Sequence, residues 1–402
     1  MATPEAATRP RPGQTRGKLK VLITVRHPVG GIRTFLRYVH ARFDPAKYAV
    51  SIIAPDSPER DAMRSDFAAL APAYYPLPFN PSPARFISHL FRAVRTERPN
   101  VIHSQGLTAG AFSSLVSAVT RTPHVVTLHD VFLPSFFAGL SGRVRRLLLA
   151  FVLRLPDRIH CVSQDVRDNL LEFVPRLSGS ANRILVIQNG IEIARFANVS
   201  PRSIRAELGL APNTFLLGFF GRFMPQKGFK YLVDAIAILL KESSLPRPLV
   251  VLTFSNDGFY REEQAQVRQL GLERHFRFLA FEPNIGPILA DIDAIAVPSL
   301  WEASSLLSME AMVVGVPVIG TDCIGLREVL HDTPSRRCPA KDGAALAREI
   351  LGEMVASTKS AALQFKSEAA RRFDVRKRAV EIEALLQSVA SQARPPAIGC
   401  AT

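Results

Sequence analysis

Short apolar runs alternate with longer amphipathic stretches through the first half of the chain. The runs are KVLITV, YAVSIIAP, VIHSQG, HVVTLHD, RIHCVS and RILVIQNG, and they have the length and the β-branched content of buried strands. The stretches between them are long enough to form helices. Strands that alternate with helices predict successive βαβ units, and therefore a parallel sheet covered by helices.

The same pattern starts again after about residue 200. The segment IEIARFANVSPRSIRAELGL ends at a Gly-Leu-Ala-Pro break, and FLLGFFGRF, PLVVLTFS, FRFLAFEP, AIAVPSL and VPVIGTD follow it. A chain of 402 residues is also longer than one hydrophobic core usually organises. We therefore predict an α/β protein with two Rossmann-like, doubly wound parallel-sheet domains facing each other across a cleft, at residues 19–199 and 200–374.

The two ends of the chain differ from these domains. Residues 1–18 are polar, are rich in Pro and Arg, and lack the apolar stretch of a secretory signal, so we expect a disordered basic leader. Residues 375–392, VRKRAVEIEALLQSVASQ, have apolar positions at helical spacing and predict a helix that could cap either domain, including the N-terminal one. Residues 393–402 are expected to form a tail.

The formal net charge of +15 is compatible with three kinds of partner: nucleic acid, an anionic membrane surface, or small phosphate-bearing ligands. Arginines alternate with apolar residues in one predicted amphipathic helix. This pattern indicates either a solvent-exposed helix face or a helix that contacts a membrane surface. The arginines are Arg143, Arg145, Arg146, Arg154 and Arg158. No uncharged apolar run reaches 18 residues, so we expect no membrane-spanning helix.

The cysteines predict neither a zinc site nor a disulfide framework. Cys161, Cys323, Cys338 and Cys400 have no CxxC spacing and no paired histidines nearby. This usage is typical of a reducing compartment. The expected location is therefore cytoplasmic. Peripheral contact with the inner face of the cytoplasmic membrane stays open as a second expectation.

Two carboxylates stand out in the segment IAVPSLWEASSLLSMEAMVVGVPVIGT. A buried strand ends at Pro298-Ser299, and we expect Glu302 to open a helix that contains Glu310. On one helix the two would lie roughly 12 Å apart along the axis, too far for acid/base work on one bond but suited to gripping an extended ligand. A glutamate at a helix start can also be a simple dipole preference. Glu310, however, sits in the apolar run LLSMEAMVV, where a carboxylate needs a partner.

A glycine pair offers a second candidate site. Gly30 and Gly31 follow the first predicted strand and precede a helical stretch, where backbone can approach a ligand closely. In open parallel sheets, ligands bind outside the carboxyl ends of the strands, and helix N-termini there attract phosphate. The pair is not the GxGxxG fingerprint of dinucleotide-binding proteins.

These motifs resemble those of the retaining glycosyltransferases of family 4, also called glycosyl transferases group 1, which have the GT-B fold. Glu302 and Glu310 match the E-x7-E signature of that family, and GRFMPQKGFKYLVDAI is similar to its basic phosphate motif. GGIRTF resembles the first glycine loop, VVTLHD the strand that ends in histidine, and HCVSQ and VIQNGIE the last strands of the first domain. The resemblance runs from about residue 19 to residue 390.

The resemblance implies a role for each matching residue. Arg222 and Lys227 would bind the donor diphosphate, Glu310 the ribose hydroxyls and Glu302 hydroxyls of the transferred sugar. His129 would face the sugar from the opposing domain and act at the reacting carbon, so the expected catalytic residues are Glu302, His129, Arg222 and Lys227. The N–H groups around Ser304, Ser305 and Leu306 would cover the phosphates, and Gly30 and Gly31 would complete the donor site.

The reaction that the resemblance implies is transfer of a sugar from a nucleotide-diphosphate donor to a glycan or lipid-linked acceptor, with retention of anomeric configuration. Cell-envelope polysaccharide or glycolipid synthesis is the expected setting. The departing diphosphate would take the acceptor proton, and the enzyme would stabilise charge without a nucleophile. We expect no cofactor and no metal, because Asp291-Ile292-Asp293 precedes a predicted strand and no Asp-x-Asp follows one.

Three alternatives remain beside this interpretation. A sugar-nucleotide epimerase of the same fold would share much of the architecture. An NAD-dependent dehydrogenase would need a GxGxxG turn followed by an acidic residue, and neither is found. A basic nucleic-acid-binding or membrane-binding protein without catalysis would explain the charge but not the glutamate pair. The donor's base and sugar stay open, because Ala303-Ser304-Ser305, Ser255 to Gly258 and Phe281 depart from the family pattern.

Overall fold

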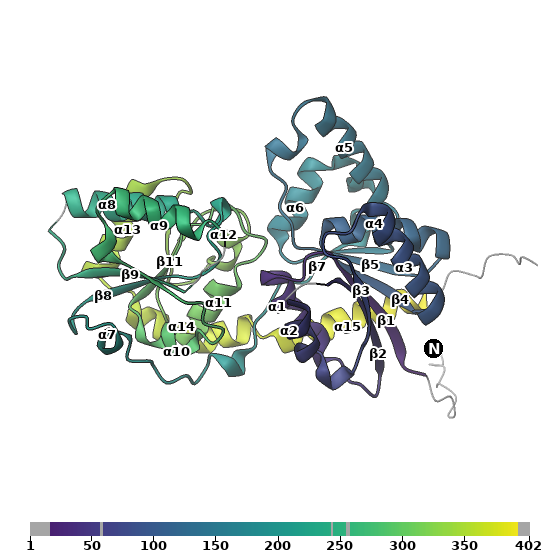
Figure 1. Cartoon of the computed structure of the whole chain (residues 1–402), viewed down its shortest axis with the longest axis horizontal. Helices are drawn as coiled ribbons and strands as arrows, with labels where there is room; N and C mark the ends of the chain where they lie inside the picture. Colours follow the sequence, from purple (N-terminus) through teal and green to yellow (C-terminus); the bar gives the residue numbers. More distant parts are fainter. Residues whose placement is uncertain (1–16, 57–58, 243, 255–257, 393–402) are drawn as a thin grey trace, which may run out of the picture.

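The computed structural model of the chain describes residues 17–56, 59–242, 244–254 and 258–392. Within them the chain forms two α/β domains side by side, each built on one parallel sheet (Figure 1). The predicted architecture of two doubly wound domains is therefore confirmed. The predicted tail and nearly all of the predicted leader lie outside the described residues.

The N-terminal domain is built on a seven-stranded sheet in the order β3-β2-β1-β4-β5-β6-β7. The strands are β1 (Leu19–Val25), β2 (Tyr48–Pro55), β3 (Ala73–Leu77), β4 (Val101–Gln105), β5 (His124–Leu128), β6 (Arg158–Cys161) and β7 (Ile184–Val186). All pairings are parallel. The apolar runs predicted all of these strands except β3. That edge strand contains a proline and partly exposed tyrosines, so it lacks the apolar pattern of its buried neighbours.

Helices connect these strands on both faces of the sheet. They are α1 (Gly30–Val39), α2 (Glu59–Asp66), α3 (Pro83–Glu97), α4 (Leu107–Thr120), α5 (Gly139–Val152) and α6 (Gln164–Phe173). Serine side chains cap two of them: Ser82 accepts the Arg85 N–H, and Ser163 accepts the Val166 N–H. Because α6 begins shortly after β6 ends, its start lies at the carboxyl end of that strand, on the edge of the sheet that faces the other domain.

The C-terminal domain is built on a six-stranded parallel sheet in the order β10-β9-β8-β11-β12-β13. The strands are β8 (Phe215–Phe219), β9 (Leu249–Phe254), β10 (Phe276–Leu279), β11 (Ala294–Val297), β12 (Val318–Thr321) and β13 (Arg336–Cys338). The helices are α7 (Ile204–Glu207), α8 (Phe229–Glu242), α9 (Tyr260–Gln269), α10 (Gly286–Asp291), α11 (Leu306–Val314), α12 (Leu326–Val329), α13 (Gly343–Val355) and α14 (Lys359–Arg372). The sequence did not predict β13, because RRC has no apolar run.

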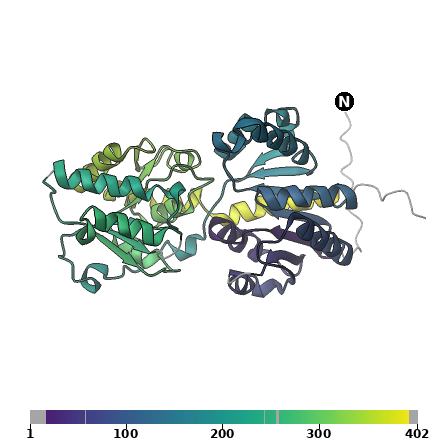
Figure 2. The ribbon, with the colours of Figure 1, turned by 45° about the horizontal axis from the view of Figure 1, so that its top comes forward.

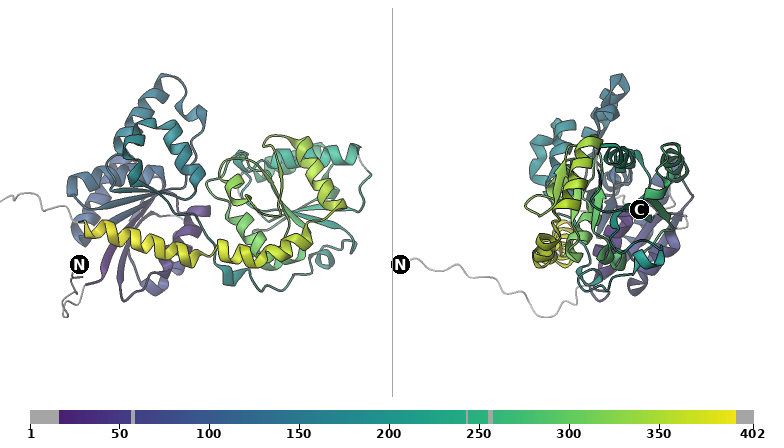
Figure 3. Two further views of the ribbon diagram at one scale, coloured as in Figure 1. Left: turned by 180° about the vertical axis from the view of Figure 1, so that it is seen from behind. Right: turned by 90° about the vertical axis from the view of Figure 1, so that its left-hand side faces the viewer.

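The chain ends by returning to the first domain. Helix α15 (Val375–Ser391) begins where the Asp374 carboxylate accepts the Arg376 N–H, and it packs against α1, β4 and β5 (Figures 2 and 3). At the crossing, Ile191 pairs with Phe373 and Val375 through 2.8 and 3.1 Å backbone hydrogen bonds. The two segments that join the domains therefore lie side by side.

Among the helices in the described part of the chain, none combines the length and the apolar character that spanning a lipid bilayer requires.

Candidate functional site

The predicted site residues follow the carboxyl ends of four strands, two in each domain. Gly30 follows β1 and His129 follows β5 in the N-terminal domain. Arg222 follows β8 and Glu302 follows β11 in the C-terminal domain. Because carboxyl ends of parallel strands share one sheet edge, each domain presents its pair at one edge.

Lys227 and Glu302 form the tightest polar contact of this group. Lys227 Nζ lies 2.7 Å from Glu302 Oε1, and Ser299 Oγ donates to the same oxygen at 2.7 Å. Glu302 is 6% exposed, so the cation and the hydroxyl stabilise a nearly buried carboxylate. Glu302 Oε2 accepts no hydrogen bond among the described residues, and it remains available to an outside donor.

The loop that carries Lys227 is fastened to the loop that carries Glu302. A 3-10 turn, η6 (Pro225–Lys227), follows β8, and the Leu300 N–H donates to the Gln226 carbonyl at 2.7 Å. The Gln226 amide returns a 2.9 Å bond to the Trp301 carbonyl. The contact between the lysine and the glutamate is thus part of a rigid loop pair.

Glu302 does not open a helix, and that expectation was wrong. α11 begins at Leu306, with Ser305 as its N-cap residue in extended conformation, and Glu302 lies in the preceding loop. Its N–H donates to the Ile324 carbonyl instead of entering a helical ladder. The axial spacing expected for two residues on one helix therefore does not apply to Glu302 and Glu310.

The start of α11, between these residues, has the features of an anion-binding position. Ser305 makes no capping bond to the helix, because its hydroxyl pairs with Ser308 Oγ at 2.9 Å. The first N–H groups of a helix have no partner within the helix. Ser304, Ser305 and Leu306 thus lead into unpaired donors at the positive end of the helix dipole.

Glu310 lies in the second turn of α11 and is partly buried. Burial raises the pKa of Glu310 to about 7, and nearby Arg195 and Arg37 partly oppose that rise. No side chain among the described residues hydrogen-bonds to Glu310. A carboxyl group in this state gains from any ligand that donates hydroxyl hydrogens to it.

Arg222 and the glycine pair face each other across the domains. A Cβ added to Gly30, whose φ is +54°, would stand 3.7 Å from Arg222 Nη2, whereas one added to Gly31 would meet nothing within 4 Å. Arg222 is exposed, and its guanidinium lies over the start of α1. A negatively charged group between the two loops could therefore contact the arginine and the N–H groups of α1.

His129 is held in place by two residues of its own domain. Its Nε2 lies 3.0 Å from Gln105 Oε1, and the Phe35 ring of α1 packs edge-on against it at 5.0 Å. Burial lowers the pKa of His129 to about 3, and repulsion by other histidines adds to the effect. The imidazole is consequently neutral at ordinary pH.

A chain of buried histidines lies beside His129, and the sequence did not predict it. His160 Nε2 must donate to the Ile187 carbonyl at 2.8 Å, so its Nδ1 accepts from Thr127 at 2.9 Å. Thr127 then accepts from His103 Nε2 at 2.7 Å, and His103 Nδ1 accepts from His40 Nε2 at 2.8 Å. His40 Nδ1 is left buried without a partner in the described part of the chain. The signal in the sequence was a histidine inside apolar strands such as VIHSQ and RIHC.

The described residues contain no cluster with the arrangement of a metal site. No group of three or more His, Cys, Asp or Glu side chains there could hold a metal ion. Cys161, Cys323 and Cys338 are buried and unpaired, and Cys400 lies outside the described residues.

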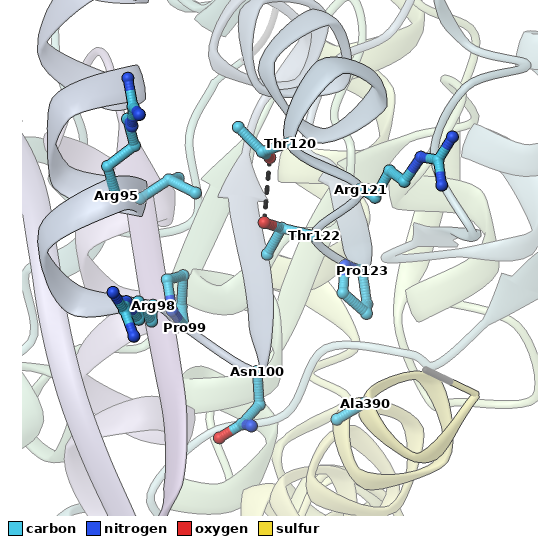
Figure 4. A pocket seen from close by; sticks show the side chains of 10 residues that line it. Arg95, Arg98, Pro99, Asn100, Thr120, Arg121, Thr122, Pro123 and Ala390 are labelled. Carbon is cyan, nitrogen blue, oxygen red and sulfur yellow. Dashed lines mark hydrogen bonds between the residues drawn. The ribbon is translucent and has the colours of Figure 1, made fainter. Parts of the chain in front are cut away.

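A hollow of about 460 Å³ lies at the opposite edge of the N-terminal sheet (Figure 4). Arg98 ends α3 and Arg121 ends α4, and both line this hollow together with Asn100. Cations at helix C-termini match the negative end of the helix dipole. The hollow adjoins the amino ends of β4 and β5, so it is separate from the candidate site.

Known families match both domains of the chain. Residues 29–195 match the family described as Glycosyltransferase Family 4, and residues 214–353 match the family described as Glycosyl transferases group 1. The first match begins at the α1 glycine loop. The second contains Arg222, Lys227, Glu302 and Glu310.

Two relatives show how far the similarity extends in sequence. The UDP-Gal:alpha-D-GlcNAc-diphosphoundecaprenol alpha-1,3-galactosyltransferase of Escherichia coli is 24% identical over 243 residues, which are 58% of this chain and 62% of that protein. A D-inositol 3-phosphate glycosyltransferase of Actinosynnema mirum is 35% identical over 37% of this chain and 38% of its own length. The chain thus covers less than two thirds of the length of these relatives.

Solved structures match nearly the whole chain in fold. HepE of Anabaena, solved in complex with UDP and glucose, aligns with a TM-score of 0.77 at 24% identity over 92% of this chain and all of that one. Sucrose-phosphate synthase of Thermosynechococcus elongatus aligns with a TM-score of 0.74 at 17% identity over 93% of this chain and all of that one. The two facing Rossmann-like domains are the GT-B fold.

Proposed function

Because this chain belongs to the group 1 glycosyl transferases with the GT-B fold, we propose that it transfers a sugar from a nucleotide-diphosphate donor to a glycan or lipid-linked acceptor. The observation that carries the proposal is the Lys227–Glu302 contact beside the uncapped start of α11. A cation, free helix amides and a carboxylate with one unused oxygen are what a diphosphate bonded to a sugar requires. The epimerase and the non-catalytic alternatives remain outcomes of the tests below.

Different site residues bind different parts of the donor, according to their charge and to whether they donate or accept hydrogen bonds. Lys227, Arg222 and the amides that lead into α11 take the diphosphate. Glu302 accepts sugar hydroxyls through its free Oε2, and Glu310 accepts the ribose hydroxyls. Each carboxylate then gains hydrogen-bond donors in addition to those that the described side chains supply.

The chemistry needs charge stabilisation more than a nucleophile. The bond from the anomeric carbon to the phosphate oxygen breaks, and the acceptor oxygen attacks the same face. This attack on the same face gives retention, and the acceptor proton passes to the departing phosphate oxygen. Lys227 and Arg222 stabilise the negative charge that develops on the diphosphate. Glu302 is already paired with Lys227 and Ser299, which favours a binding role over nucleophilic attack.

Donor binding is testable with a thermal-shift panel of UDP-glucose, GDP-mannose, ADP-glucose and dTDP-glucose. A ligand that binds only the native state at a hundredfold excess over its Kd adds about 2.7 kcal/mol of stability, so we expect one nucleotide to raise the unfolding midpoint by several degrees. UDP-glucose is tested first, because HepE was solved with UDP and glucose. The configuration of the product formed from the best donor is then read by NMR.

Two outcomes would contradict the proposal. The first is the absence of any shift with all four nucleotide sugars. The second is tight, salt-sensitive binding of double-stranded DNA, which would favour the nucleic-acid alternative suggested by the net charge.

We further propose that the protein docks at an anionic membrane surface through α5, so that a lipid-linked acceptor can reach the cleft. Five apolar side chains of α5 recur at helical spacing and are 48–76% exposed: Leu140, Val144, Leu147, Leu148 and Phe151. Arg143, Arg145 and Arg146 accompany them, and residues 131–156 contain no acidic residue. An exposed apolar stripe flanked by arginines suits anionic lipid, whereas like charge opposes pairing of two copies through this helix.

Vesicle sedimentation tests this docking surface. Vesicles that contain phosphatidylglycerol should bind the protein more tightly than vesicles of phosphatidylcholine alone. The double variant Leu148→Ser/Phe151→Ser should weaken binding at least about tenfold, because two large side chains lose their apolar contact. Leu363→Ser/Val380→Ser, which alters exposed apolar residues on α14 and α15, is the matched control. Equal effects of the two double variants, or loss of a dimer in place of loss of vesicle binding, would overturn the assignment.

A further inference from the structure

The two domains meet where the first residues of α6 face the short helix α12. The Asp165 carboxylate accepts a 2.6 Å hydrogen bond from the Gly325 N–H and further bonds from the Arg327 guanidinium, the shortest also 2.6 Å. In the opposite direction, the Glu328 carboxylate accepts the Asp165 N–H at 3.0 Å. Each helix start is therefore capped by a carboxylate from the other domain.

The segment that Asp165 binds also supports the backbone of Glu302. Gly325 has a φ of +74°, and a Cβ added there would stand 1.9 Å from the Glu302 carbonyl oxygen, so only glycine fits. The Glu302 N–H donates to the Ile324 carbonyl at 2.9 Å. Movement of the 324–325 backbone would consequently displace Glu302.

A second contact from the N-terminal domain reaches the next residue of the same loop. Ser163 Oγ donates to the Ala303 carbonyl at 2.7 Å. Ser163 is 2% exposed and Asp165 is 8% exposed, so these bonds are shielded from water and costly to leave unmade. The N-terminal domain thus holds the Glu302 loop directly at residue 303 and indirectly through residue 325.

We infer that Asp165 is a positioning residue through which the N-terminal domain places Glu302 for the donor sugar. The inference rests on the proposed function, because it assigns Glu302 to the sugar. Arg222, Lys227 and Glu310 all belong to the C-terminal domain, and among the described residues none of them forms a hydrogen bond or an ion pair with Asp165. These three residues are carried by other segments of the C-terminal domain, so we expect nucleoside diphosphate binding to depend less on Asp165 than binding of the sugar does.

Asp165→Asn tests this dependence, with Asp168→Asn as the matched control. Asp168 is on the same helix, and its side chain is 59% exposed, so its variant loses the same charge without touching the other domain. The probe is whichever of the four nucleotide sugars shifts the wild-type protein most, together with its nucleoside diphosphate. For Asp165→Asn we expect the Kd of the nucleotide sugar to rise about tenfold, while the Kd of the nucleoside diphosphate changes less than twofold. Asp168→Asn should change neither.

Hydrogen exchange gives a second measurement on the same proteins. The Glu302 and Gly325 amides should exchange faster in Asp165→Asn than in Asp168→Asn. Arg327→Gln, which keeps the bond from Asp165 to the Gly325 amide, should give an intermediate effect, and it serves as the test variant if Asp165→Asn does not fold.

The outcomes separate this inference from the proposed function. A wild-type protein that binds no nucleotide sugar refutes the proposed function. A wild-type protein that binds the nucleotide sugar, with Asp165→Asn binding it equally well, refutes only the positioning role. Equal weakening of nucleotide sugar and nucleoside diphosphate would likewise overturn it, since Asp165 would then serve domain contact in general.

Discussion

Lys227→Ala is expected to lower the rate of sugar transfer about a hundredfold to a thousandfold, the range seen when one preorganised charge-stabilising group is removed. The substitution removes the cation assigned to the departing diphosphate, and it leaves Glu302 with Ser299 as its remaining side-chain partner. The measurement is the release of nucleoside diphosphate in the presence of acceptor. The variant should remain folded but with a lower unfolding midpoint, because the nearly buried Glu302 carboxylate loses its cation.

Lys230→Ala is the matched control for this loss. Lys230 is an exposed lysine on α8, three residues further along the chain, and it lies over the ring of Tyr231. Its variant should retain full activity. Glu310→Ala should also abolish transfer, in this case through loss of donor binding. Full activity in both Lys227→Ala and Glu310→Ala would remove the basis for the donor site.

Acidification is expected to destabilise the protein steeply below pH 6.5. His40, His103 and His160 are fully buried, and burial lowers the pKa of His40 to about 3 and of His160 to about 4, with that of His103 also well below its usual value. The unfolded chain binds protons on these histidines near pH 6.5, whereas the folded chain does not until the pH is far lower. Stability is therefore complete above pH 6.5 and falls as the pH drops toward 4.

The size of this effect follows from proton linkage. At pH 5.5 each buried neutral histidine lowers the free energy of unfolding by about 1.4 kcal/mol. The three together lower it by about 4 kcal/mol relative to neutral pH. That is a large share of the stability of an ordinary domain. The measurement is urea-induced unfolding at pH 8, 6.5 and 5.5.

A variant pair separates the buried chain from other titrations. His103→Gln keeps an acceptor toward His40 and a donor toward Thr127 but removes one proton-binding group, so its stability should depend less on pH. His331→Gln changes an exposed histidine and should leave the pH dependence as it is. A free energy of unfolding that is constant from pH 8 to pH 5.5 in the wild type would show that the histidines are not held neutral by burial.

The sequence around Glu302 and Glu310 did not predict correctly where the helix that contains Glu310 begins. The spacing of Glu302 and Glu310 predicted one continuous helix from residue 302, whereas the structure starts that helix at Leu306. The contact that keeps residue 302 outside the helix comes from a later segment of the chain, because the Glu302 N–H donates to the Ile324 carbonyl. No window around residue 302 contains that information.

The contact between the domains and the histidine chain likewise could not be predicted from the neighbouring sequence. Asp165 and Arg327 are 162 positions apart, and nothing in the sequence around either residue indicates the other. His40, His103 and His160 come from a 3-10 turn, η1 (His40–Arg42), and from two strands that are not adjacent in the sheet. Their pairing follows from strand order and register, which apolar runs do not specify.

The sequence by itself determined the two α/β domains, most of their strands, and the family motifs that place Arg222, Lys227, Glu302 and Glu310 at strand ends. It could do so because strand length, helical spacing and turn residues act over a few neighbouring positions. Only the tertiary structure decided which side chains meet: Lys227 with Glu302, Gly30 with Arg222, and Asp165 with the loop beneath Glu302. These contacts join segments that are distant in the chain: the first is fixed by packing within the C-terminal domain, and the other two by packing of the two domains against each other.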